Sequence, residues 1–365
     1  MAGVYISYPF CSQKCTYCNF ASGVFSGQTQ KEYEAALLDE LASHQWRWMP
    51  ETLYWGGGTP SLMELETLST YMAAIPCGRL SETTLECAPG NVNRERAEAW
   101  AKLGVNRISL GVQSFVTAEL RRTGRRHKAE TVRDEMALLA DCGIHNVNVD
   151  LIAGLPGQSP ESWRQSLEWI ARLQPPHVSV YMFEKDEDSR LGREATLGGV
   201  RYGAALLPSD DLVAEMYQTA VDFLAMLGIA RYEISNFARH GYESRHNLKY
   251  WRGEPYVGFG LDAHSFDGAR RWSNPDNLDE YLAMRVARRD PREEGACVDI
   301  EEEHFFVGLR LTEGIEPTED ERVRFAPGIE KALGDGLLER AGPRLRLTPR
   351  GVLLSNEVFA EFIHV

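Results

Sequence analysis

The segment YPFCSQKCTYCNF, Tyr8 to Phe20, places three cysteines close together with the spacing Cys11-x3-Cys15-x2-Cys18. A structural zinc site needs four ligands, usually from two Cys-x2-Cys pairs, and the chain has no second pair. A thioredoxin-like dithiol uses two cysteines and leaves Cys11 unexplained. Three thiolates on an iron–sulfur cluster leave one iron without a protein ligand, where a substrate can bind. We therefore favour the cluster over the zinc site and the dithiol.

Around this segment, short apolar runs alternate with segments of helical period. Strands are predicted over residues 4–10, 52–57, 84–89, 107–115, 146–155 and 177–184. Helices are predicted over residues 31–43, from about 62, and over 94–103, 129–142, 160–173 and 209–228. The strands are too apolar to alternate cleanly, which is typical of a parallel sheet buried on both faces. Six βα units in series predict an α/β fold with right-handed crossovers, arranged as a partial (β/α)6 barrel.

The composition changes beyond the barrel. Residues 229–297 are rich in aromatic residues, glycine and histidine, with few runs of helical period. Residues 298–365 contain charged helices, followed by a strand, a Gly-Pro turn, a second strand and a closing helix. This order is similar to a wing and its neighbouring helix. We therefore predict a barrel over 1–228, a connecting region over 229–297 and a small α+β, winged-helix-like domain over 298–365.

The charge of the chain disfavours nucleic acid as a partner. It carries 39 basic and 53 acidic side chains, a net charge of −14, and its densest basic cluster, RRTGRRHK at 121–128, is short. Proteins that grip phosphate backbones usually have an obvious basic surface. No apolar run reaches the roughly 18 residues of a membrane span, and no export leader is visible. A cytoplasmic location is expected.

Polar residues occur at or near the ends of several predicted strands. Three glycines, Gly56 to Gly58, end the second strand, either as a tight turn or to let the backbone approach a ligand. Glu86, Gln113 and Asp150 lie on the third, fourth and fifth strands. A carboxylate or amide in an apolar strand is costly to bury without a partner. We expect these side chains to share a cavity with the cysteine segment at the carboxyl ends of the strands.

With these features, the chain resembles the radical S-adenosylmethionine (SAM) superfamily. In that superfamily SAM chelates the open iron of a 4Fe–4S cluster, and one electron cleaves it to a 5′-deoxyadenosyl radical. The resemblance implies that Cys11, Cys15 and Cys18 hold such a cluster and that SAM takes the fourth position. Positions matching SAM contacts in the coproporphyrinogen dehydrogenase branch are Tyr5, Tyr17, Gly57, Gly58, Thr59, Glu86, Gln113, Arg125, Asp150 and Glu184.

Two departures from coproporphyrinogen dehydrogenase point to a sister family, the HemW-type haem chaperones. Phe20 stands where that enzyme has a further cysteine, and its N-terminal extension before the cysteine segment is missing here. The segment HNLKYW, His246 to Trp251, fits the His-Asn-x-x-Tyr-Trp motif of the HemW-type proteins. The resemblance implies that His246, Tyr250 and Trp251 contact haem, with His246 a candidate axial ligand. A buried, hydrogen-bonded histidine beside core aromatics is the alternative.

The resemblance therefore implies a protein that holds haem for delivery to acceptor haemoproteins, membrane cytochromes among them. Cluster and SAM would regulate haem binding or dimerisation rather than turn over a substrate, so no catalytic residue is assigned. A homodimer and peripheral membrane contact are both compatible with this role. The main alternative is an oxygen-independent coproporphyrinogen III oxidase. More distant alternatives are a tRNA-modifying radical SAM enzyme and a zinc-binding structural protein.

Overall fold

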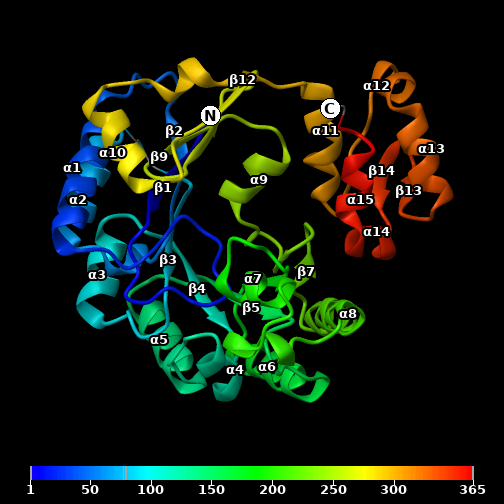
Figure 1. The fold of residues 1–365 in the computed structure, drawn as a ribbon, viewed down its shortest axis with the longest axis horizontal. Coiled ribbons are helices and arrows are strands. Elements are labelled where there is room, and N and C mark those ends of the chain that lie inside the picture. The colour runs from blue at the N-terminus through cyan, green and yellow to red at the C-terminus, as the bar shows by residue number, and fades with distance from the viewer. Residues whose placement is uncertain (1, 77, 79, 364–365) are drawn as a thin grey trace.

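Parallel strands form the centre of the protein. The computed structural model describes residues 2–76, 78 and 80–363, and within them the main sheet has twelve strands in the order β12-β11-β10-β9-β1-β2-β3-β4-β5-β6-β8-β7 (Figure 1). Its central parallel strands are β1 (Ala2–Tyr8), β2 (Pro50–Gly57), β3 (Glu82–Cys87), β4 (Arg107–Gln113), β5 (Asn146–Ala153) and β6 (His177–Met182). The predicted partial barrel of six βα units is confirmed.

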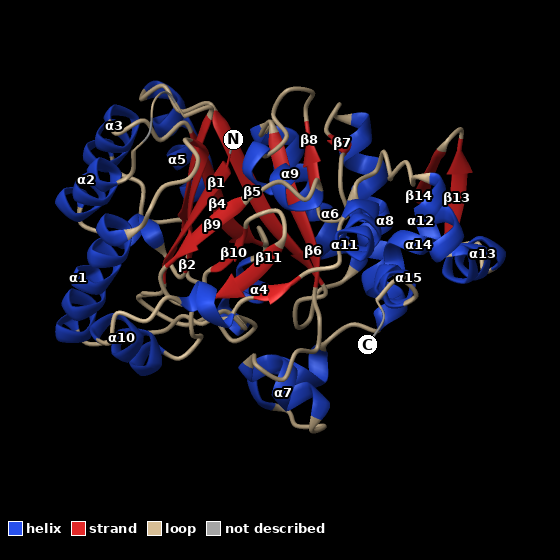
Figure 2. Ribbon diagram, turned by 90° about the horizontal axis from the view of Figure 1, so that it is seen from above, coloured by secondary structure: helices blue, strands red, loops and turns tan. Residues whose placement is uncertain are grey.

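Helices cover the outside of this sheet (Figures 1 and 2). They are α1 (Gly27–Ser43), α2 (Leu65–Ala74), α3 (Arg94–Lys102), α4 (Thr117–Arg122), α5 (Ala129–Asp141), α6 (Pro160–Leu173) and α8 (Asp210–Met226), with the 3-10 turn η1 (Pro60–Leu62). Helix α7 (Arg190–Thr196) and the 3-10 segment η2 (Arg201–Leu206) pack on each other apart from these helices, and the Leu191 N–H donates to the Thr16 carbonyl of the cysteine segment at 2.8 Å. Helix α1 begins before the predicted residue 31 because Ser26 caps it, its hydroxyl accepting the Thr29 N–H at 3.1 Å. Among the described residues, no helix is long and apolar enough to cross a bilayer.

The region predicted as a connection, 229–297, supplies strands to both edges of the main sheet. It contains β7 (Ala230–Arg231), β8 (Asn236–Ala238), α9 (Arg245–Trp251), β9 (Tyr256–Phe259), β10 (His264–Phe266), β11 (Arg270–Ser273), α10 (Leu278–Val286), η3 (Pro291–Glu294) and β12 (Ala296–Cys297). β9 pairs parallel with β1, whereas β8 pairs antiparallel with β6. Between these edges the chain forms α9, which lies inside the ring of elements in Figure 1.

The C-terminal part lies to one side of the barrel, away from α1, α2 and α3 (Figure 2). It comprises α11 (Ile300–Phe306), η4 (Gly308–Arg310), α12 (Glu319–Arg324), α13 (Ala326–Gly334), β13 (Leu338–Ala341), β14 (Arg344–Leu347), α14 (Pro349–Leu353) and α15 (Ser355–Ala360). β13 and β14 form an antiparallel pair, in the predicted strand–turn–strand–helix order. Phe305 packs against Phe325 and Phe362, with both pairs of ring centroids 4.6 Å apart, and forms a local aromatic core.

The glycine turn after β2 packs directly on the start of the cysteine segment. The N–H groups of Gly58 and Thr59 donate to the carbonyls of Tyr8 and Phe10 at 2.9 and 3.0 Å. A Cβ added at Gly58 would lie only 2.6 Å from the carbonyl carbon of Pro9. The missing side chain at Gly58 therefore allows two backbone segments to touch. This close backbone contact by itself requires glycine at position 58, in addition to the predicted approach of the backbone to a ligand.

Replacing Gly58 with alanine should disturb this contact, because the new Cβ meets backbone that cannot rotate away. We expect Gly58→Ala to lower the free energy of unfolding by about 1–3 kcal/mol, the usual cost of overpacking, and to reduce iron incorporation. Urea unfolding and iron analysis after anaerobic reconstitution measure both effects. Gly27→Ala is the matched control, because a Cβ there meets no atom within 4 Å. Equal stability and iron content in the two variants would contradict this role.

Candidate functional site

The three clustered cysteines lie on the loop between β1 and α1, and backbone hydrogen bonds close the base of this loop. The Cys11 N–H donates to the Gly23 carbonyl at 2.8 Å, and the Gly23 N–H donates to the Pro9 carbonyl at 2.9 Å. Cys11, Cys15 and Cys18 are all free thiols with partial solvent exposure. The loop therefore holds three available thiols beyond a closed base, at the carboxyl end of the first strand.

The surroundings of these thiols fit an iron–sulfur cluster. The Thr59 hydroxyl donates to Cys11 Sγ at 3.6 Å, and burial raises the pKa of the Cys11 thiol. A buried thiolate needs positive charge nearby, and cluster iron supplies it. Within the described residues, no three His, Cys, Asp or Glu side chains stand ready grouped around a metal position. We expect the three thiols to draw together around the cluster as it binds.

Arg125 lies beside the cysteine loop, although in the chain it follows β4 and α4. Its Nε donates to the Tyr17 hydroxyl at 3.0 Å and its Nη1 donates to the Gly111 carbonyl at 2.7 Å. A Cβ added at Gly111 would lie 3.1 Å from Gln113 Nε2 and 3.3 Å from Arg125 Nη2. Gln113 itself adopts φ 69°, a left-handed conformation uncommon outside glycine. Tyr17, Gln113 and Arg125 are thus brought together above the end of β4.

A row of partly accessible side chains lies on otherwise buried strands of the barrel. Tyr5, Tyr54, Glu86 and Asp150 are each more accessible than the residues on either side of them in β1, β2, β3 and β5. Tyr5 and Tyr54 are register partners, and their rings stack with centroids 6.1 Å apart. We call these four residues the inner row. Tyr54 was not predicted from the sequence, where a tyrosine in an apolar strand was the available signal.

The two carboxyl groups of the inner row influence each other. The Tyr54 hydroxyl donates to Glu86 Oε1 at 2.9 Å. Burial, with the charge of Asp150 added, raises the pKa of Glu86 to about 7. Burial also raises the pKa of Asp150, which accepts from Asn148 Nδ2 at 2.7 Å and from Ser109 Oγ at 3.2 Å. Near neutral pH, Glu86 can therefore donate or accept a hydrogen bond, which suits a partner bearing hydroxyl groups.

The structure places the remaining predicted SAM residues in two environments. Gly57 and Thr59 flank Gly58 in the turn packed on the cysteine loop, and Gly57 adopts φ 100°. Glu184 follows β6 by two residues and its side chain is exposed. The turn is thus close to the cysteines, whereas the structure gives Glu184 no place in the inner row.

Helix α9, which carries the HNLKYW segment, is anchored to the barrel by ionic contacts. The Glu82 carboxylate on β3 accepts the backbone N–H groups of Arg245 and His246 at 2.9 and 3.0 Å. The buried Lys249 ammonium lies 2.7 Å from Glu51 and 2.8 Å from Glu254. A carboxylate at a helix N-terminus also interacts favourably with the helix dipole. These contacts fix the orientation of the whole motif.

Within this helix, His246 is buried and both of its ring nitrogens have partners. Nδ1 lies 2.9 Å from Thr52 Oγ1, and Nε2 lies 2.8 Å from the Tyr250 hydroxyl. Burial lowers the pKa of His246 to about 3, so the ring is neutral. In this arrangement His246 could ligate iron only by giving up one of these hydrogen bonds. The geometry favours the structural alternative for His246 over the predicted axial ligand.

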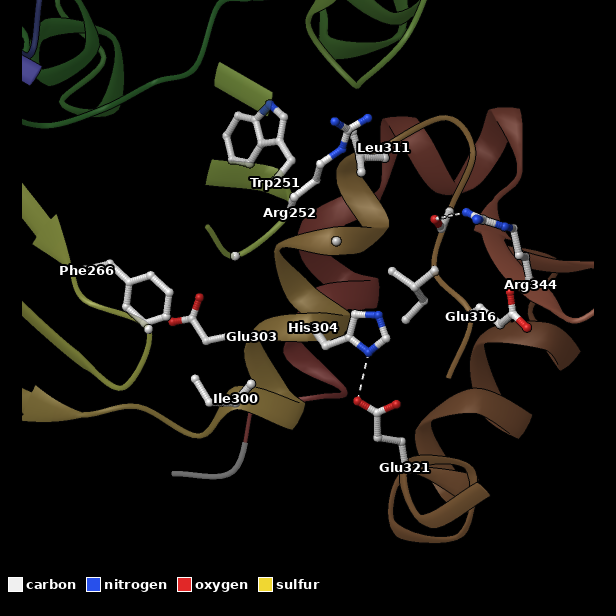
Figure 3. A pocket seen from close by; sticks show the side chains of 15 residues that line it. Trp251, Arg252, Phe266, Ile300, Glu303, His304, Leu311, Glu316, Glu321 and Arg344 are labelled. Carbon is white, nitrogen blue, oxygen red and sulfur yellow. Dashed lines mark hydrogen bonds and ion pairs between the residues drawn. The ribbon is translucent and has the colours of Figure 1, made fainter. Parts of the chain in front are cut away.

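Trp251, by contrast, reaches a cavity. The Arg310 guanidinium lies 4.4 Å from the centroid of the Trp251 ring, and Trp251 lines a space of about 510 Å³ next to the C-terminal part (Figure 3). The motif also joins this cavity to the inner row, since the His246 ring lies 5.3 Å from Tyr54 and 5.2 Å from Tyr250. Tyr250 is in turn 6.2 Å from Trp251. One aromatic series therefore connects the barrel interior with the cavity.

Comparison with known proteins agrees with this architecture. A family model described as the radical SAM superfamily matches residues 5–170, and one described as the HemN C-terminal domain matches residues 299–354. The radical SAM family implies a 4Fe–4S cluster and SAM. Coproporphyrinogen III oxidase (HemN) of Escherichia coli, a radical SAM enzyme, superposes with a TM-score of 0.83 over 99% of this chain and 89% of that one, at 22% identity. That likeness shows a shared fold.

Sequence similarity extends over nearly the whole chain. Heme chaperone HemW of Lactococcus lactis is 34% identical, covering 98% of this chain and 96% of that protein. Heme chaperone HemW of Bacillus subtilis is 34% identical, covering 100% and 99%. Heme chaperone HemW of Escherichia coli is 30% identical, covering 99% and 97%.

Each clustered cysteine should be needed for the metal. We expect Cys11→Ala, Cys15→Ala and Cys18→Ala each to lose most of the iron and acid-labile sulfide after anaerobic reconstitution, because two thiolates hold a cluster poorly. Cys297→Ala removes an exposed thiol far along the chain and is the control. Circular dichroism verifies folding. Full iron content in all three variants would rule out this ligand set, and zinc without sulfide in the unaltered protein would rule out the cluster.

The raised pKa of Glu86 predicts a pH dependence of stability. A carboxyl that binds its proton more tightly in the folded state reduces stability as the pH rises from its unfolded pKa towards its folded pKa. As the pH rises from about 5 to about 8, the free energy of unfolding of the unaltered protein should therefore fall by about 2 kcal/mol more than that of the Glu86→Gln variant. Urea titrations of cluster-free protein measure this difference. Glu187→Gln, which alters an exposed carboxylate, is the control. If the free energy of unfolding depended on pH equally in the Glu86→Gln and Glu187→Gln variants, the effect assigned to Glu86 would be excluded.

Proposed function

Because the chain belongs to the HemW family of the radical SAM superfamily, we propose that it is a haem chaperone that holds haem in the cytoplasm for transfer to acceptor haemoproteins. The observation that carries this proposal is the near full-length similarity to three bacterial HemW proteins. The position of the HNLKYW motif supports it, because Trp251 lines a cavity large enough for a small-molecule ligand.

The cluster is part of the proposal. Cys11, Cys15 and Cys18 would hold a 4Fe–4S cluster, with SAM at the open iron. When bound, the pair supplies one-electron chemistry. The protein would contribute the closed base of the cysteine loop, which orients the three thiols, and the Gly57–Thr59 turn packed against it.

Around SAM, the proposed contacts divide by chemistry. Arg125 offers a positive charge beside the loop, where it can meet a carboxylate. Glu86 and Asp150 offer hydrogen-bonding carboxyl groups on the inner face of the barrel, where they can meet the hydroxyl groups of a ribose. The full proposed set is Tyr5, Tyr17, Gly57, Gly58, Thr59, Glu86, Gln113, Arg125, Asp150 and Glu184.

The partners in this proposal are haem and the proteins that receive it, membrane cytochromes among them. Formation of a homodimer and peripheral contact with a membrane belong to the same proposal. The formal charge of −14 disfavours a role on nucleic acid.

An oxygen-independent coproporphyrinogen III oxidase is the second candidate, and the fold similarity to HemN favours it. That reaction decarboxylates propionate side chains by means of the 5′-deoxyadenosyl radical, so each decarboxylation consumes one SAM. The residue two positions after the third cysteine, Phe20, is 62% exposed here. A cysteine stands at that position in the coproporphyrinogen dehydrogenase family, and this difference favours the chaperone.

One preparation can distinguish the two functions. After anaerobic reconstitution, the protein is titrated with haem and separately incubated with SAM, a reductant and coproporphyrinogen III. A chaperone binds haem in about one equivalent without forming decarboxylated porphyrinogen. An oxidase forms it together with one 5′-deoxyadenosine for each propionate that is decarboxylated. Failure to bind haem would refute the chaperone role whatever the outcome of the second assay.

The Cys11→Ala, Cys15→Ala, Cys18→Ala triple variant adds a test of how cluster and haem are related. We expect it to retain haem binding, because the cavity lined by Trp251 lies on other elements than the cysteine loop. Comparing its haem titration with that of the unaltered protein measures this directly. Loss of haem binding in a variant that remains folded would show that the cluster is required to form the haem site.

A further inference from the structure

The cavity beside Trp251 lies between the barrel and the C-terminal part. Its volume of about 510 Å³ falls within the range of roughly 300–1,000 Å³ common for small-molecule sites. The barrel contributes Trp251 and Phe266, and the C-terminal part contributes Ile300, Leu311 and Ile315. Figure 3 shows Trp251, Phe266 and Ile300 on one side of α11, whereas the imidazole of His304 is directed towards Glu321. A half-open, mainly apolar cavity with an imidazole and charged groups in its wall suits a flat, metal-containing ring with carboxylate side chains.

His304 on α11 has the hydrogen-bonding pattern of a metal ligand. Its Nδ1 lies 2.8 Å from Glu321 Oε1 on α12. The Glu321 side chain is only 7% exposed, and its other oxygen accepts the Thr318 N–H at 2.7 Å. A carboxylate only accepts hydrogen bonds, so Nδ1 carries a proton, and in the neutral imidazole Nε2 keeps its lone pair. Histidines that bind metals commonly donate their second N–H to a carboxylate in this way.

The imidazole of His304 remains accessible. Its side chain is 36% exposed, and within the described residues its Nε2 has no hydrogen-bond partner. Gly308 stands one helical turn further on, where an added Cβ would come within 3.6 Å of His304 Cδ2 and 2.6 Å of Ile315 Cγ2. Glycine at this position lets the Ile315 side chain pack against the helix close to the imidazole. His304 therefore differs from His246, whose two ring nitrogens are both engaged.

Charged side chains around the cavity also suit haem, which carries two propionates. Arg252 and Arg344 are half-exposed and lie 3.9 and 3.8 Å from opposite oxygens of Glu313, at long ion-pair distances. Such exposed pairs contribute little energy, so the Arg252 guanidinium can turn to a carboxylate ligand, whereas Arg344 Nη1 also donates to the Gly314 carbonyl at 3.2 Å. Glu303 is already paired with Arg271 at 2.8 Å, which limits its repulsion of propionates.

We propose that this cavity seats haem, with His304 Nε2 as the axial iron ligand, Glu321 as the residue that positions it and Trp251 as an aromatic wall. This inference rests on the proposed chaperone function and specifies where that function binds its cargo. The HNLKYW motif then acts by holding Trp251 in place through His246 and Tyr250. His246 is a positioning residue in this arrangement, and His304 binds the iron.

Haem titration of the full-length protein, followed by absorption spectroscopy, tests the assignment. We expect His304→Ala to weaken haem binding by at least about tenfold, equivalent to about 1.4 kcal/mol, and to lose the spectrum of histidine-ligated iron. Added imidazole should restore that spectrum in His304→Gly. His304→Cys should shift the spectrum towards thiolate-ligated haem, because thiolate is an alternative axial ligand.

The positioning role of Glu321 has a matched control on the same helix. We expect Glu321→Gln to weaken haem binding about 10- to 100-fold, the usual effect of removing the partner of a metal-binding histidine, while the histidine-ligated spectrum remains. Glu319→Gln alters an exposed carboxylate of α12 that does not line the cavity, and it should bind haem normally. His246→Ala should change the affinity for haem but keep the spectrum of the axial ligand.

The outcomes separate this inference from the proposed function. Haem binding by the unaltered protein with an unchanged affinity and spectrum in His304→Ala would overturn the site and leave the chaperone function standing. Loss of the histidine-ligated spectrum in His246→Ala, but not in His304→Ala, would return the iron ligand to the HNLKYW motif. If the unaltered protein bound no haem, the proposed function itself would fail. Thermal unfolding by circular dichroism confirms that each variant is folded.

Discussion

The contact between the glycine turn and the end of β1 determines where the chemistry of this protein lies. Parallel pairing of β1 with β2 brings Gly58 and Thr59 onto the backbone of Tyr8 to Phe10. Any side chain at Gly58 would collide with Pro9. Because Cys11 follows at once, the position of the cysteine loop is set by a backbone contact that only glycine allows. The same turn places the Thr59 hydroxyl against the Cys11 thiol.

Electrostatics extend this arrangement across the inner face of the barrel. Arg107 is buried at the start of β4, and its positive charge lowers the pKa values of Glu86 and Asp150, against the larger effect of burial. The same charge helps to keep His177 and His246 neutral, in addition to their burial. A buried charge needs compensating partners. The acidic and neutral polar groups of the barrel interior therefore form one interdependent set around Arg107.

The HNLKYW helix connects this interior with the C-terminal part. Glu82 holds its beginning, Lys249 is paired with Glu51, and Trp251 at its end meets Arg310 of η4. A change in the barrel can reach the cavity through these packed rings and ion pairs. This physical continuity would let a cluster at one end affect a ligand at the other.

The α/β fold, the order of the six βα units and the three thiols could all be predicted from the sequence, because strand hydrophobicity and cysteine spacing are local patterns. It also indicated Glu86, Gln113 and Asp150 as unusual, because polar groups in apolar strands are costly to bury. It left open what the HNLKYW histidine does. The folded structure was needed to show that Thr52 and Tyr250 occupy both nitrogens of His246. It was also needed to show that His304, with no motif around it, contacts Glu321 in the cavity that Trp251 lines. These contacts join residues from separate elements, and their partners depend on how β2, α9, α11 and α12 pack together.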